Sequence, residues 1–84
     1  MKIYIAVETT PIKGGVEARV PALRLVGHGR QLGEATDCLQ RGVLAWCRGL
    51  QAAGQLQITL GRKGIAVEED NASDTISLVM SMAD

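Results

Sequence analysis

Residues 18–35 read ARVPALRLVGHGRQLGEA, and within this stretch the periodicity of the chain changes. Ala18 and Val20 alternate with Arg19, a period of two that is typical of a half-buried strand. Pro21 ends that ladder because it has no N–H to donate. A short strand is expected over residues 23–26, followed by a Gly-His-Gly segment in which the glycines permit a positive φ. From Leu32 the period becomes 3.6, which predicts a helix.

The predicted helix covers residues 31–53. On a helical wheel its apolar and small residues fall within one arc of about 100°, the width of a core-facing stripe: Leu32, Ala35, Leu39, Gly42, Val43, Trp46, Leu50 and Ala53. A glycine inside a helix is less favourable than alanine by about 1 kcal/mol. We therefore expect Gly42, which lies in the arc, and Gly49, which borders the arc, to let the helix approach a sheet closely. The opposite face is polar except for Leu44.

Strands are predicted on both sides of this helix. Residues 2–8 alternate in the same way as residues 16–20, which indicates an antiparallel hairpin. Beyond the helix, alternation predicts further strands over residues 56–60, 65–67 and 75–82, with a tight turn at 61–64. The expected fold class is α+β: a single helix packed on a mostly antiparallel sheet, βββα followed by additional C-terminal strands. We expect one domain over residues 1–84, with no separate DNA-binding domain.

The charges are unevenly distributed along this neutral chain of 84 residues. Residues 1–63 hold nine basic and four acidic side chains (9 − 4 = +5), and residues 64–84 hold five acids and no base (−5). This pattern does not predict a nucleic-acid binder, which presents a continuous basic surface. There is no signal-peptide pattern and no apolar run of about 18 residues. We expect a cytoplasmic protein that contacts no membrane.

The two cysteines are not predicted to pair. Cys38 and Cys47 are nine residues apart in one helix, which separates them by roughly 13 Å along its axis and points them to opposite sides. The short spacing of a zinc site is absent, and His28 is the only histidine. We interpret both cysteines as buried free thiols.

Few residues suggest catalysis. His28 stands between two glycines, where it is either a general base or a polar turn residue, and no nucleophile lies near it in the sequence. Gly27-x-Gly29 before a helix is either a turn or a phosphate cradle, but the remaining residues of a phosphate-binding motif are missing. Glu8 and Glu17 fall on the solvent face of the hairpin and are more consistent with pairing to Lys2 and Arg19 than with binding a metal. We predict no enzymatic activity, no metal and no cofactor.

Several short motifs follow one another in a specific order. They are Gly14-Gly15, Ala18-Arg19-Val20-Pro21-Ala22-Leu23, Gly29 and Glu34-Ala35. Over residues 3 to about 54 this order and spacing resemble the HicB-like antitoxin family. The resemblance implies a degenerate ribonuclease-H-like fold that lacks catalytic acids and serves for binding. It also implies a homo-oligomer that covers the active surface of a small HicA-type RNA-cleaving toxin. Family members often carry a C-terminal DNA-binding segment, which residues 55–84 do not suggest.

Two surfaces are predicted to bind protein. The acidic residues Glu68, Glu69, Asp70 and Asp74 either meet the basic surface of a toxin or form a solvated connection that aids solubility, with Leu44 as the alternative contact on the outer helix face. The last strand would otherwise end as a bare edge, so we expect a homodimer or larger assembly. Its interface residues are Ile76, Leu78, Val79, Met80 and Met82. The alternative function is a solitary homo-oligomeric HicB-like domain without a toxin partner.

Overall fold

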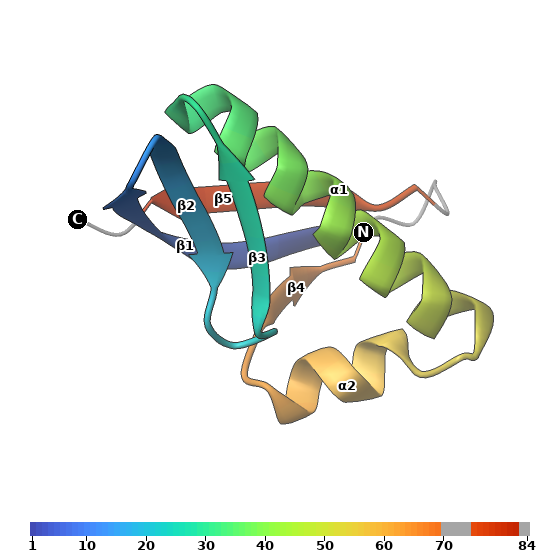
Figure 1. Cartoon of the computed structure of the whole chain (residues 1–84). Coiled ribbons are helices and arrows are strands. Elements are labelled where there is room, and N and C mark those ends of the chain that lie inside the picture. Colours follow the sequence, from blue (N-terminus) through green and yellow to red (C-terminus); the bar gives the residue numbers. More distant parts are fainter. Residues whose placement is uncertain (70–74, 83–84) are drawn as a thin grey trace.

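The computed structural model describes residues 1–69 and 75–82 and confirms the α+β fold class (Figure 1). A five-stranded, mostly antiparallel sheet carries one long and one short helix. In chain order the elements are β1 (Lys2–Ile12), β2 (Gly15–Val20), β3 (Leu25–Gly29), α1 (Leu32–Ala52), α2 (Leu56–Arg62), β4 (Ala66–Glu68) and β5 (Ser77–Met82).

Strand β1 is the centre of the sheet. Its second half forms the predicted hairpin with β2, in a register that places Glu8 opposite Arg19, and β2 in turn pairs antiparallel with β3. Its first half lies between β4, which is antiparallel to it, and β5, which is parallel to it. Strands from both ends of the chain therefore meet on β1.

The core lies between the sheet and α1. Every second residue at the start of β1 is buried, and α1 buries Ala35, Leu39, Val43 and Cys47. These four helix positions are each four residues apart, and four residues turn a helix by 400°, so the buried stripe advances by about 40° per step. The slant explains why Cys47 joins the core whereas Leu32, at 48% exposed, and Ala53 do not, although both were predicted to.

Both cysteines are free, as predicted. Cys47 is fully buried, and this burial raises the pKa of its thiol. Cys38 is only partly buried, so the prediction of a buried thiol holds for Cys47 and not for Cys38.

The close approach of helix to sheet is made by glycines of the strand, not of the helix. A Cβ added to Gly27 would lie 2.4 Å from the backbone nitrogen of Leu39, and one added to Gly29 would lie 2.5 Å from that of Ala35. Gly42 and Gly49 face open space. The predicted role of Gly42 was therefore wrong. So was the expected positive φ in the Gly-His-Gly segment, because these residues belong to β3.

The connection between β2 and β3 also differs from the prediction. Strand β3 begins at Leu25 rather than at Leu23, which is buried inside the preceding turn. Two backbone hydrogen bonds close that turn, from Leu23 N–H to the Val20 carbonyl and from Arg24 N–H to the Pro21 carbonyl. The turn ends with Arg24 at φ 56°, a left-handed conformation that is rare for residues other than glycine.

The segment predicted as a strand over residues 56–60 is the helix α2. Leu56 and Leu60 are both buried, and a spacing of four residues suits a helix as well as an alternating strand. Helical geometry leaves Ile58 at 52% exposed, whereas strand geometry would have put it beside the two leucines. Gly61 and Arg62 end α2, so the expected tight turn is reduced to Lys63 and Gly64.

Candidate functional site

The acidic segment begins at the end of β4, where Glu68 lies opposite Lys2 of β1. The Tyr4 hydroxyl donates a hydrogen bond to the Glu68 carboxylate, with 2.6 Å between the two oxygens. This hydrogen bond is the main cause that raises the pKa of Tyr4, and burial and the negative charge of Glu68 raise it further. Tyr4 thus ties Glu68 to strand β1, and the distribution of charges along the sequence does not point to Tyr4.

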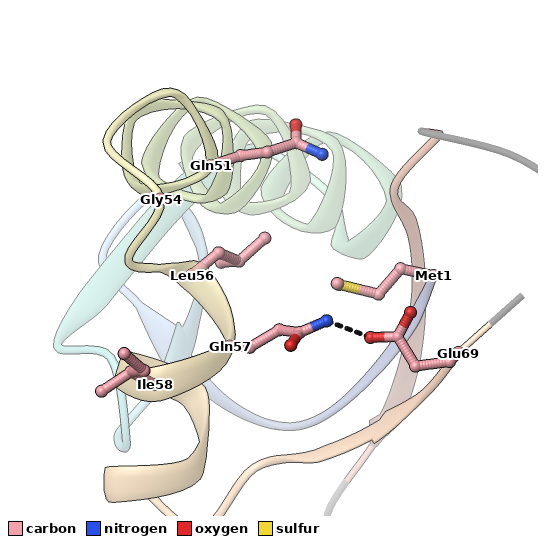
Figure 2. A pocket seen from close by; sticks show the side chains of 7 residues that line it. All are labelled: Met1, Gln51, Gly54, Leu56, Gln57, Ile58 and Glu69. Carbon is pink, nitrogen blue, oxygen red and sulfur yellow. Dashed lines mark hydrogen bonds between the residues drawn. The ribbon is translucent and has the colours of Figure 1, made fainter.

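The next residue, Glu69, has its partner on a different element. Its carboxylate accepts a hydrogen bond from the side-chain amide of Gln57 on α2 (Figure 2). Both carboxylates are exposed, but one is tied to β1 and the other to α2. Asp70 and Asp74, the other two acids of the predicted contact, lie outside the described residues.

Glu69 stands at the edge of a cavity of about 410 Å³ between the end of α1, helix α2 and the start of β1. Figure 2 shows the side chains of Met1 and Leu56 beside the Gln57–Glu69 hydrogen bond. The lining residues are Met1, Gln51, Gly54, Leu56, Gln57, Ile58 and Glu69, so Glu69 has the one ionisable side chain among them. The terminal ammonium of Met1 donates to the Thr75 carbonyl at 3.1 Å, which holds this corner together. The lining of the cavity is mixed: three apolar side chains and two glutamine amides surround a single carboxylate.

Sequence reasoning missed Met1, Gln57 and Ile58 as parts of this site. Gln57 and Ile58 depend on α2 being a helix, because its turn places Gln57 toward Glu69 and leaves Ile58 exposed at the cavity. Met1 joins the site because β1 pairs with β4. The four-residue spacing of Leu56 and Leu60 did not reveal this helix, because it fits a strand equally well. Leu44, predicted as an alternative contact, lies partly buried on α1 and outside the core cluster.

Strand β5 divides its apolar residues between the core and the surface. Ile76, Leu78 and Met80 pack against the core but remain partly accessible, while Val79 is 37% and Met82 46% exposed. Helix α1 packs mainly on β3 and β2 rather than on β5. Among the described residues, β5 pairs only with β1, so its second edge carries no strand.

The residues weighed for catalysis are dispersed. Glu8 pairs with Arg19, with 3.0 Å between carboxylate oxygen and guanidinium nitrogen, as expected for a solvent-face pair. His28 is exposed on β3 opposite Glu17, and its flanking glycines pack against α1 rather than lining an anion site. Over residues 1–69 and 75–82, no three His, Cys, Asp or Glu side chains come together in a way that could hold a metal ion. The absence of enzymatic activity stays a prediction.

Comparison with known proteins does not identify this chain. No family model, no curated protein and no solved structure matches it. Neither of the two helices in the described part of the chain is long and apolar enough to cross a membrane. The resemblance to HicB-like antitoxins therefore stays a prediction.

Proposed function

We propose that this chain is a HicB-like, antitoxin-type protein that binds and neutralises a small RNA-cleaving toxin in the cytoplasm. The element order supports this proposal, because three strands, a long helix and later strands are what the resemblance implies, although the short helix α2 stands before those later strands. The carboxylates also agree with a binding role: Glu8 forms a solvent-face ion pair with Arg19, and Glu68 accepts a hydrogen bond from Tyr4.

The cavity beside Glu69 is the observation that carries the proposal. A protein that cleaves RNA presents lysine and arginine side chains to the phosphate backbone. Such side chains bury their aliphatic stems along apolar surface and keep the charged head polar. In this cavity a stem would lie against Met1 and Leu56, and its head would meet the Glu69 carboxylate. Exposed Ile58, which also lines the cavity, supplies a further apolar contact.

Glu68, Asp70 and Asp74 extend the negative charge on either side of Glu69 in the sequence. Acidic side chains around an interface steer a basic partner toward it and accelerate association, mainly at low salt. We assign Glu69 the contact and the other three acids this steering role.

A titration with a HicA-type toxin at two salt concentrations tests the proposal. Glu69→Gln keeps the shape of the side chain and removes its charge, and Asp37→Asn on the exposed side of α1 removes the same charge elsewhere. We expect Glu69→Gln to weaken binding roughly tenfold, because it leaves a cation without its partner, and Asp37→Asn to leave the affinity within about twofold. Equal effects of the two variants would refute a contact at Glu69.

A second candidate function is a solitary homo-oligomeric domain without a toxin. The edge of β5 that pairs with none of the described strands favours it, because this edge can join copies of the chain without another protein. A neighbouring reading frame that encodes a small basic protein would favour the antitoxin, and the absence of one would favour the solitary domain.

A further inference from the structure

Within residues 1–69 and 75–82, one edge of the β5 backbone pairs with no strand, and this edge is called the free edge. The N–H of Ser77 donates to the Met1 carbonyl at 2.9 Å, and the Thr75 carbonyl accepts from the Met1 ammonium at 3.1 Å. Within a strand, the N–H and C=O groups of alternate residues point to the same side. Odd-numbered residues of β5 therefore point to β1. The even-numbered residues point their backbone groups to the free edge, and these are Ile76, Leu78, Met80 and Met82.

The side chains of β5 follow the two faces of β1. Leu78 and Met80 are register partners of Ile3 and Ile5, so they share the core face. Val79 is the register partner of Tyr4 on the outer face, which α1 does not cover. Each side chain is thus committed to one face, and a strand added at the free edge has to match this alternation.

We propose that β5 pairs with β5 of a second copy of this chain, antiparallel, about a twofold axis at Val79. Such an axis is perpendicular to the sheet and keeps each face continuous. Neighbouring residues of a strand point to opposite faces, so the axis has to lie where one residue faces its own copy. The pattern of apolar residues and serines is symmetric about Val79: Ile-Ser-Leu precedes it and Met-Ser-Met follows it. Serine then faces serine on the outer face, and apolar residues face apolar residues on the core face.

The register centred on Val79 uses the whole free edge. Ile76 pairs with the second copy's Met82 and Leu78 pairs with its Met80, so all four outward-pointing residues of each copy find partners. An axis at Met80 would shift the ladder and leave Ile76 unpaired within the described strand. Residues 75–82 contain neither a charged residue nor a proline, the devices with which exposed edges usually prevent pairing.

The pairing also explains the exposed apolar residues near this edge. Tyr4 and Val79 are each 37% exposed in the single chain. In the paired sheet they form one band that runs from Tyr4 through Val79 to the second copy's Val79 and Tyr4. Because the twofold contact closes on itself, it yields a dimer and not a fibre. The pairing does not depend on whether the chain binds a toxin.

The solution mass tests whether the pairing exists. A single chain has a mass of 8.9 kDa, so the wild type should give 2 × 8.9 = 17.8 kDa by light scattering at micromolar concentration. In Met80→Pro the missing N–H is one that points to the free edge, so the β1 ladder is retained. We expect this variant to halve the mass while keeping the circular dichroism spectrum. A wild-type mass of 8.9 kDa would overturn the proposal and leave the edge to a strand of another protein.

Disulfide trapping tests the register. In the proposed dimer Val79 faces its own copy in a non-hydrogen-bonded pair, where Cα atoms are about 4.5 Å apart, within the range of roughly 4.4–6.8 Å that disulfides span. The two Met80 residues are offset along the strands, which puts their Cα atoms about 8 Å apart. In a Cys38→Ala background, Val79→Cys should form the linked dimer on oxidation and Met80→Cys should not. Linkage through Met80→Cys in preference to Val79→Cys would refute the register, even if Met80→Pro failed to fold.

Discussion

Replacing Gly27 by alanine should destabilise this protein, because strand β3 and helix α1 touch at this glycine. The added Cβ would lie 2.4 Å from the Leu39 nitrogen and 2.6 Å from the Ala35 carbonyl oxygen. Both atoms are backbone, so no side-chain rotation relieves the contact. Ordinary contact begins at 3.4 Å, so α1 and β3 have to separate by about 1.0 Å (3.4 − 2.4). This movement loosens the packing of Ala35 and Leu39, which are both buried.

The size of the loss follows from two opposing effects. Overpacking a core lowers stability by about 1–3 kcal/mol, and two rigid backbone groups at this position place Gly27→Ala at the upper end. Alanine also restricts the unfolded chain, which returns about 0.4–1 kcal/mol. The net loss is about 2 kcal/mol, and in a domain of this size it lowers the Tm by roughly 8–16 °C.

Gly42→Ala is the matched control, because the same substitution there meets nothing within 4 Å. In the exposed face of α1 it should raise stability by about 0.5–1 kcal/mol through better helix propensity. Thermal and urea unfolding of both variants at one protein concentration, followed by circular dichroism, measures the two changes. Should Gly27→Ala unfold at or above the wild-type Tm, the close contact of β3 with α1 would be refuted.

Three further predictions concern single side chains. Arg24→Gly should stabilise the protein by about 0.5–1 kcal/mol in urea unfolding, because it removes the left-handed strain of a non-glycine residue; a loss of stability would contradict this. The chain has one tyrosine, so ultraviolet titration reports Tyr4 directly, and the raised pKa of Tyr4 should fall in Glu68→Gln. The Tyr4–Glu68 hydrogen bond should stabilise the fold fully below pH 10, the ordinary pKa of tyrosine, and this stabilisation should disappear as the pH rises through the raised pKa. Cys38 should react with a thiol reagent in the folded protein and buried Cys47 only on unfolding, and equal rates would contradict this difference.

Periodicity was sufficient to predict the elements whose pattern fits only one geometry. The hairpin of β1 and β2 alternates strictly, and α1 is long enough for its 3.6-residue period to be unambiguous. Helix α2 was mistaken for a strand because Leu56 and Leu60 satisfy both periods over a short segment. The pairing of β5 with β1, parallel and from the opposite end of the chain, has no local signal.

The site was predictable only in part, for a related reason. Charge alone pointed to Glu68 and Glu69, since acids without bases stand out in a sequence. Their partners Tyr4 and Gln57 lie 64 and 12 residues away, and they become neighbours only through the sheet and α2. The glycines show the same limit. Composition indicated a close contact of helix and sheet, but only the structure shows that Gly27 rather than Gly42 makes it.

An RNA-cleavage assay tests the proposed antitoxin function most directly. A HicA-type toxin from a neighbouring reading frame is incubated with labelled RNA and increasing amounts of the purified chain. We predict that excess wild-type protein stops cleavage. At toxin concentrations well below the dissociation constant, Glu69→Gln should require roughly ten times more protein for the same inhibition, because it lacks the charge at the cavity. An unchanged cleavage rate in the presence of excess folded wild-type protein would contradict the proposed antitoxin function.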